Sequence, residues 1–280
     1  MKNLHRATAV LTGLAITLSS CSQNNASSQS AAKDSVSAAV VPKAPISLDP
    51  VADVALFPNA QLSMNTPTST PNGDSAKVNF TFNVKNYKLM GQTTDSASMQ
   101  CSNSKQGQHI HFILDNKPYA ALYEPKHEVT LPKNSEHYLM AFLSRSYHLS
   151  LKEKGVAVLY HFKVDAQGKI QKLADPTAPM LFYSRPKGDY IGNDVNNVLL
   201  DFYVWNATLG NDFKVKANIH SVDADTSFTI SEWKPYFLRN LPMGKTTIHL
   251  TLLDKTGNPL TGENTTVSRD INLAHQEPLK

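Results

Sequence analysis

The fold can be read from residues 78–86, VNFTFNVKN, in which the first seven side chains alternate between apolar and polar. A period of two is typical of a β-strand with one buried face. The second half of this stretch, FNVKN at 82–86, returns as FYVWN at 202–206, and in both places a leucine and a glycine follow. An internal repeat of this kind predicts two copies of one β-domain.

The repeat extends in both directions from this strand. Upstream, LSMNTP at 62–67 matches LFYSRP at 181–186, and downstream both copies carry a Leu-Pro turn before another alternating strand. Each copy has about 100 residues, the usual size of an immunoglobulin-like sandwich. We therefore predict an all-β chain with two tandem immunoglobulin-like β-sandwiches, the first over 59–174 and the second over 175–280.

The N-terminus carries an export signal. Lys2 and Arg6 precede a mostly apolar run over 7–18, which is shorter than the roughly 20 residues of a membrane span. The run ends in LSSC, which resembles a bacterial lipobox. We predict a signal peptide over 1–20, lipidation of Cys21, and a flexible tether over 21–58 that is rich in Ser, Ala, Asn and Gln.

A lipidated cysteine would make the membrane a partner through acyl chains. Ser22 after the cysteine resembles the pattern of outer-membrane lipoproteins, so we expect an outer-membrane protein that faces the periplasm or the cell surface. Loss of residues 1–20 would lower the net charge from +4 to near +2, which is too small to indicate a nucleic-acid partner. Cys101 would then be the only free thiol.

Two histidines stand one residue apart in QHIHFIL at 108–114. His109 and His111 lie on one face of the predicted strand and Ile110, Phe112 and Leu114 on the other. The second copy has Lys214 and Lys216 at the matching places, which favours a solvated polar face. Structural or hydrogen-bonding roles for these histidines are a further alternative.

A metal site is the competing interpretation. Six of the ten histidines fall between 109 and 161, and side chains two apart on a strand can converge on one ion. The candidate ligands are His109, His111, His137 and His148, and imidazole suits copper or zinc. A thiolate from Cys101 near these histidines would favour copper.

Basic and aromatic residues form a second candidate site. Arg145 and His148 belong to the segment SRSYH, and Arg185 and Lys187 belong to the similar segment YSRPK. With Tyr119, these side chains could bind a phosphopeptide or another anion, because arginine recognises phosphate and carboxylate in a bidentate manner. Ordinary surface loops are the alternative.

The segments GQHIHFILDNKPYAALY and LPKNSEHYLMAFLSRSYHLSLK resemble a largely uncharacterised family of exported lipoproteins of the Bacteroidetes type. The shared features are a Gln-His-x-His strand, an Asp-Asn turn, a Leu-Pro turn and a Ser-Arg-x-x-His segment. Some members of this family are described as phosphopeptide-binding. The resemblance implies a lipoprotein with a β-sandwich fold.

The sequence lacks the common enzyme signatures, including Gly-x-Ser-x-Gly, His-Glu-x-x-His and a phosphate-binding glycine loop. We therefore expect a binding or interaction protein of the cell envelope rather than an enzyme, with an envelope protein or an acidic peptide as possible partner. The alternatives are a periplasmic protein that binds copper or zinc through the histidines, and an anion-binding module.

Overall fold

The computed structural model describes residues 43–276. The predicted signal peptide, the lipidated Cys21 and the tether up to residue 42 lie outside the described residues. Within them the all-β prediction is confirmed: four sheets form two β-sandwiches, and the strands expected at 78–84 and 109–114 are present as β4 (Ser75–Lys85) and β5 (His109–Leu114).

The first sandwich pairs a sheet built around β4 with a five-stranded sheet in the order β10-β9-β8-β5-β6. Three strands, β2, β3 and β7, pair antiparallel with β4. The apolar face of each strand packs into one core between the sheets. The remaining strands are β2 (Gln61–Met64), β3 (Thr68–Asn72), β6 (Ala120–Leu122), β7 (Lys126–Pro132), β8 (Ser135–Ser144), β9 (Ala157–Val164) and β10 (Ile170–Lys172).

The second sandwich has a four-stranded sheet, β1-β16-β13-β11, and a five-stranded sheet, β12-β18-β17-β14-β15. A separate apolar core fills the space between them. Its elements are β1 (Ser47–Pro50), β11 (Met180–Arg185), β12 (Gly188–Ile191), the 3-10 turn η1 (Gly192–Val195), β13 (Val198–Trp205), β14 (Lys214–Ser221), β15 (Asp225–Ile230), β16 (Tyr236–Arg239), β17 (Gly244–Leu253) and β18 (Thr266–Ala274).

The sequence repeat corresponds to a structural repeat. β4 and β13 occupy matching places, as do β5 and β14, each of which lies between two antiparallel neighbours. Asn86 and Asn206, the last residues of the repeated pentapeptide, both have positive φ, at 53° and 52°. Each donates its side-chain amide to a backbone carbonyl, of Asn59 and of Pro176 respectively. The pentapeptide therefore encodes the strand and also the turn after it.

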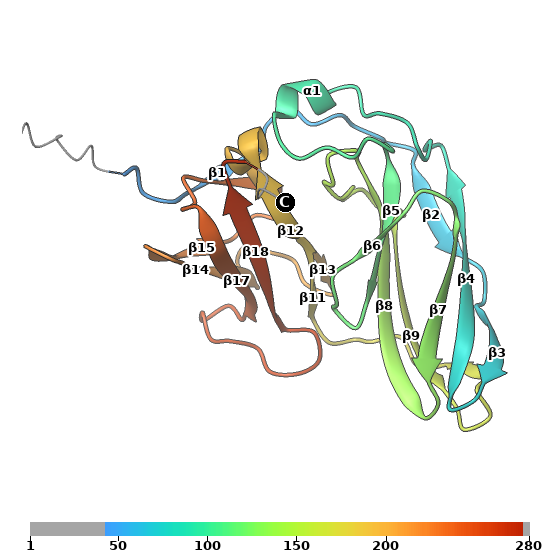
Figure 1. The fold of residues 1–280 in the computed structure, drawn as a ribbon. Coiled ribbons are helices and arrows are strands. Elements are labelled where there is room, and N and C mark those ends of the chain that lie inside the picture. Colours follow the sequence, from blue (N-terminus) through green and yellow to red (C-terminus); the bar gives the residue numbers. More distant parts are fainter. Residues whose placement is uncertain (1–42, 277–280) are drawn as a thin grey trace, which may run out of the picture. The chain divides into compact units, whose positions relative to one another are not determined.

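The inner sheets of the two sandwiches pack on each other, so several strands are buried on both faces. Alternate residues of β13 enter the core of the second sandwich, while Tyr203 joins Phe182, Phe142 and Met140 in an apolar cluster shared by both sandwiches. Figure 1 shows β11 and β13 next to the sheet that contains β5 and β8. Residues 43–280 form one compact unit.

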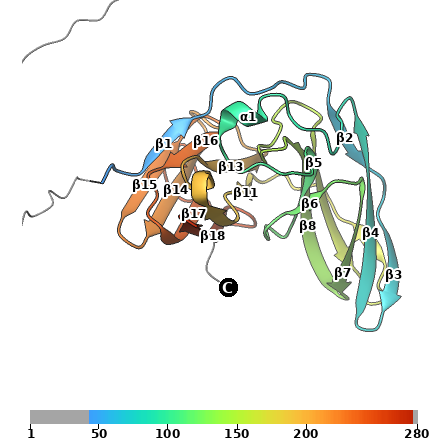
Figure 2. The same ribbon diagram turned by 45° about the horizontal axis from the view of Figure 1, so that its top comes forward.

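The chain enters this unit through the second sandwich. β1 pairs antiparallel with β16, with Ser47 opposite Arg239 and Pro50 opposite Tyr236 (Figure 2). The chain then crosses to the first sandwich, where β2 begins at Gln61. The tether was expected to reach residue 58, but β1 lies inside that range, because a second-sandwich edge supplies hydrogen-bond partners for this segment.

One short helix, α1 (Ser96–Met99), precedes β5. Its residue Met99 and the neighbouring Cys101 are buried in a small cluster with Tyr147, Leu199 and Phe237. Within residues 43–276 the structure contains no helix of the length and apolarity that a membrane span requires.

Candidate functional site

The histidine-bearing face of β5 is buried, so the expectation of a solvated face is wrong for the first sandwich. His109 and His111 are both 0% exposed. The cause is the tandem arrangement: this face of β5 points toward the second sandwich, and His111 reaches Ser184 of β11. Lys214 and Lys216 are only half-buried, because β14 lies in the outer sheet of the second sandwich.

A third histidine completes a compact cluster, which we call the histidine triad: His109, His111 and His148. Nε2 of His109 lies 2.9 Å from Nε2 of His111 and 3.1 Å from Nδ1 of His148. One nitrogen from each ring lies within 4.8 Å of the others. His148 reaches this position from the turn after β8, where it adopts a positive φ of 68°.

The outer nitrogens of the triad are held by fixed partners. Nδ1 of His109 lies 2.7 Å from the carbonyl of Gly107, which can only accept, so this nitrogen carries the proton. In the neutral ring Nε2 then presents a lone pair to the centre of the triad. Nδ1 of His111 lies 3.0 Å from the Ser184 hydroxyl, which can donate or accept. In His148 it is the inner nitrogen that has such a partner: Nδ1, which faces His109, also lies 3.1 Å from the Tyr119 hydroxyl.

The triad is kept neutral by its surroundings. The pKa of His109 is lowered to about 4, mainly by burial; the hydrogen bond to Gly107 raises it, and the nearby charge of Arg185 lowers it. Burial is also the main cause that lowers the pKa of His111 and of His148, followed by repulsion from neighbouring histidines and from Arg185. Three neutral imidazoles therefore face one another at neutral pH.

His137 does not join the triad. It lies at the other end of the sheet, on the core-facing side of β8. Its Nδ1 is 2.8 Å from Oδ2 of Asp115, and its Nε2 is 2.7 Å from Oγ of Ser135. Ser135 donates in turn to the carbonyl of Pro132. Both ring nitrogens of His137 are therefore engaged in fixing the turn between β7 and β8 and the end of β5.

Three of the four residues proposed for anion binding lie beside the triad. The Tyr119 ring stacks on His111 at 3.6 Å between centroids. Nζ of Lys187 lies 4.4 Å from the centre of the Tyr119 ring and donates to the Tyr119 carbonyl. Arg185 lies 5.7 Å from the same ring centre and is buried without an acidic partner among the described residues. Its Nε has no hydrogen-bond partner.

Arg145 lies elsewhere and is occupied by the backbone. Its guanidinium donates to the carbonyls of Ala55 and Ser150 and lies over the Phe57 ring. These contacts fasten the segment between β1 and β2 to the first sandwich, so Arg145 has a structural role. Cys101 is also separate from the triad, and burial raises the pKa of its thiol to about 12.

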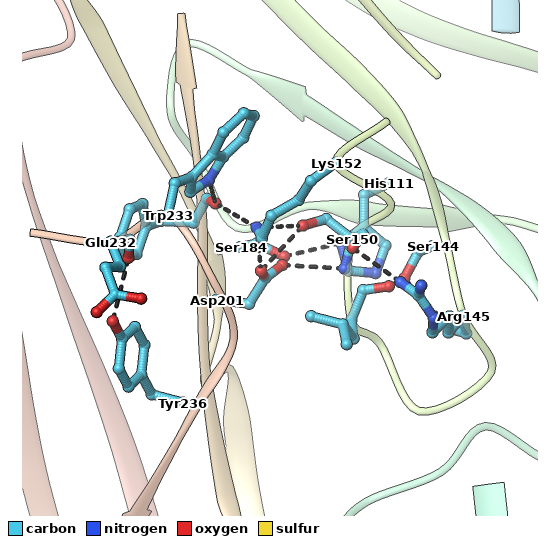
Figure 3. Close-up of polar contacts among 12 residues, drawn as sticks. His111, Ser144, Arg145, Ser150, Lys152, Ser184, Asp201, Glu232, Trp233 and Tyr236 are labelled. Atoms are coloured by element: carbon cyan, nitrogen blue, oxygen red, sulfur yellow. Dashed lines mark hydrogen bonds and ion pairs between the residues drawn. The ribbon is translucent and has the colours of Figure 1, made fainter. Parts of the chain in front are cut away.

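Sequence reasoning missed the residues that orient the triad and the ion pair beside it. Gly107 and Ser184 carry no motif of their own. The pair is Lys152 and Asp201, 2.9 Å apart, and the Asp201 carboxylate also accepts from the backbone and the hydroxyl of Ser150. Figure 3 shows this pair with His111 and Ser184. An aspartate inside the apolar strand VLLDFYVW was the one available signal.

Comparison with known proteins gives no family. No family model matches the chain, and no curated protein matches it. The solved structures that are similar include the fibronectin(III)-like modules of Clostridium thermocellum CbhA, with 10% identity over 77% of this chain and 95% of that chain and a TM-score of 0.26. The FN1-FN3 domains of chicken CNTN1 share 11% identity over 79% of this chain and 67% of that chain, with a TM-score of 0.25. At these scores neither similarity bears on function, and the two-sandwich architecture rests on the sheets themselves.

Proposed function

We propose that this chain is a cell-envelope binding protein whose ligand is a transition-metal ion held by the histidine triad. The observation that carries the proposal is the convergence of three imidazole nitrogens from His109, His111 and His148 on one point inside the protein. Imidazole nitrogen is a preferred ligand of copper and zinc.

The spacing of the three nitrogens fits an ion. Metal–nitrogen bonds of about 2.0–2.1 Å place the ligand atoms about 3.3–3.6 Å apart in tetrahedral or trigonal sites. The distances in the triad, from 2.9 Å up to no more than 4.8 Å, bracket this value. Small rotations of the rings would equalise them.

The surrounding hydrogen bonds also resemble those of a metal centre. A ligating histidine commonly donates its other N–H to a carbonyl or a hydroxyl, which fixes the tautomer and the ring orientation. The Gly107 carbonyl accepts such a hydrogen bond from His109, and the Ser184 hydroxyl can accept one from His111. The hydroxyl can also donate to His111, so one arrangement of heavy atoms suits both a hydrogen-bonded and a metal-bound triad.

Metal analysis of the chain, purified without a histidine tag, tests the proposal. We expect about one copper or zinc ion per chain after loading, and loss of that ion in the variant His109→Ala/His148→Ala. The matched control is His161→Ala, because His161 is also hydrogen-bonded through both ring nitrogens but lies outside the triad. No metal under any loading, or metal retained by the double variant, would contradict the proposal.

The location in the envelope is part of the proposal and rests on the lipobox-like segment that ends at Cys21. A lipidated cysteine would attach the chain to the membrane. Radioactive palmitate should label the wild-type chain and leave Cys21→Ser unlabelled. Equal labelling of both chains would remove this part of the proposal.

Anion binding is a second candidate, favoured by the buried Arg185 with its unpartnered Nε and by Lys187 beside it. A phosphopeptide or another acidic ligand of this kind should bind more weakly as salt rises, since charges screen each other over about 10 Å at 0.1 M ionic strength. We expect Lys187→Ala to weaken such binding and Lys234→Ala, on an exposed lysine, to leave it unchanged. Binding that salt does not alter would rule this candidate out.

A further inference from the structure

From the charges around the histidine triad and the number of its donors, we infer that its cargo is a monovalent, soft cation of the Cu(I) type rather than a divalent ion. This inference rests on the proposed function and names the ion class for the same site. Three features of the structure support it: the charge of the ligands, the charge of the neighbours, and the number of donors.

The ligands bring no negative charge. His109, His111 and His148 are neutral imidazoles, and no carboxylate belongs to the group that the described residues bring together. Asp201, the one buried acid among the described residues, already pairs with Lys152. A divalent ion in this site would keep its full double charge in a buried environment, where an uncompensated charge is costly.

The neighbours add positive charge. Arg185 and Lys187 both lie over the Tyr119 ring, which itself stacks on His111. Both cations repel a metal ion bound at the triad, and this repulsion is twice as large for a dication as for a monocation.

The protein supplies three histidine donors. The nitrogens of His109, His111 and His148 are the only His, Cys, Asp or Glu ligand atoms that the described residues group in this way, and the Tyr119 hydroxyl lies 3.1 Å from Nδ1 of His148. Zinc sites are almost always four-coordinate, so zinc would need a water or another oxygen as the fourth ligand here. A monovalent ion such as Cu(I) is satisfied by two or three donors. The number of histidine donors therefore favours the same ion as the charge.

Sulfur ligands are not needed for this selection. Cys101 lies in a different cluster, with Met99 and Tyr147, and no thiol belongs to the triad. Selection against divalent ions would then depend on charge and coordination number, and a change in local charge should alter it. This gives the inference its own test, separate from whether a metal binds at all.

The test is an anaerobic titration of the whole chain with Cu(I) against a chromogenic Cu(I) chelator, with Ag(I) and Zn(II) titrated in parallel. We expect one Cu(I) and one Ag(I) per chain, each bound at least 100-fold more tightly than Zn(II). His148→Ala should abolish Cu(I) binding. Because His148 lies in a turn and is only half-buried, this variant should keep its fold, which a thermal melt checks, and His161→Ala should bind as wild type.

Lys187→Met tests the effect of charge, since it keeps the length of the side chain and removes the cation together with its hydrogen bond to the Tyr119 carbonyl. We expect the preference for Cu(I) over Zn(II) to narrow by about tenfold in this variant. Zn(II) bound at the triad as tightly as Cu(I) would overturn the inference and leave the proposed metal function intact. Failure of all three ions to bind would overturn both.

Discussion

At the residue scale, the junction of the sandwiches depends on one buried ion pair. Asp201 is almost fully buried, and it accepts from Lys152 and twice from Ser150. Burial lowers the pKa of Lys152, while the carboxylate beside it acts in the opposite direction. The pair is thus an example of a charge that is tolerated in a core only because its partner is present.

We predict that Asp201→Asn destabilises the protein by about 3 kcal/mol, because it leaves the Lys152 ammonium buried without its counter-ion. The matched control is Asp175→Asn, which breaks the exposed pair with Lys172 and should change stability by less than about 0.5 kcal/mol. Urea unfolding of the three chains measures both values. Equal effects of the two substitutions would contradict this account.

Cys101 gives a prediction about pH. Burial raises the pKa of its thiol from 9.0 to about 12 in the folded protein. The contribution of the neutral, buried Cys101 thiol to the free energy of unfolding is therefore complete below pH 9. It is lost as the pH rises from 9 toward 12, because the thiol of the unfolded chain releases its proton first. At pH 8 a disulfide reagent such as DTNB should label Cys101 of the Cys21→Ser chain slowly in the native state and rapidly in guanidinium. Rapid labelling of the native chain would show that the thiol is accessible.

At the scale of elements, the turn before β5 determines how the triad is held. Gly107 has a φ of 87°, and a Cβ at this position would lie 2.6 Å from the carbonyl oxygen of Gly91. Only glycine fits both conditions, and the same residue supplies the carbonyl that orients His109.

We expect Gly107→Ala to destabilise the protein and to weaken metal binding, since the backbone must shift to relieve the contact. Gly257→Ala is a matched control: its φ is 89°, but a Cβ there meets nothing within 4 Å. Gly257→Ala should lower the free energy of unfolding only by the cost of a positive φ, about 1–2 kcal/mol, and Gly107→Ala should lower it by more. Thermal melts and metal titrations of both variants provide the comparison. Similar losses in the two would mean that the contact with Gly91 is unimportant.

The strands were predictable because alternation and the repeat are local properties of the sequence. The burial of the histidine face was not predicted, because it depends on which sandwich covers which sheet. The comparison of His109 and His111 with Lys214 and Lys216 was misleading, because β14 lies in an outer sheet while β5 lies in an inner one. The continuous apolar run of β13, broken only by Asp201, is typical of a strand that is buried on both faces.

The candidate site was predictable only in part, for the same reason. His109 and His111 are linked by their spacing on a strand, and the structure brings the predicted His148 to them from the turn after β8. His137 faces the core of the first sandwich, a placement set by the register of β8. Ser184, the partner of His111, is 73 residues away from it in the sequence and lies across the junction between the sandwiches. No local pattern identifies it.

At the scale of the whole molecule, the two sandwiches share an apolar cluster and should unfold together. The cluster unites side chains from β5, β6 and β8 with others from β11 and β13, including the stacked rings of Phe142 and Tyr203, 4.9 Å apart. Polar contacts cross the same junction, among them the Asn116 amide, which bonds to the backbone of Leu181 and Tyr183. A junction with this much buried apolar surface couples the stability of its two sides.

The placement of the tryptophans allows a direct test of this coupling. Both tryptophans of the chain, Trp205 and Trp233, belong to the second sandwich and pack against the shared apolar cluster, so their fluorescence reports the unfolding of that sandwich and of the junction. Phe162→Ala removes a fully buried ring from the core of the first sandwich and should cost about 3–5 kcal/mol. If the sandwiches unfold as one, the free energy of unfolding measured by fluorescence should fall by that amount, and calorimetry should show a single peak. If each sandwich unfolds alone, calorimetry should show two peaks, and Phe162→Ala should move only one of them. The first outcome would also mean that an ion bound at the triad, which lies at the junction, stabilises both sandwiches.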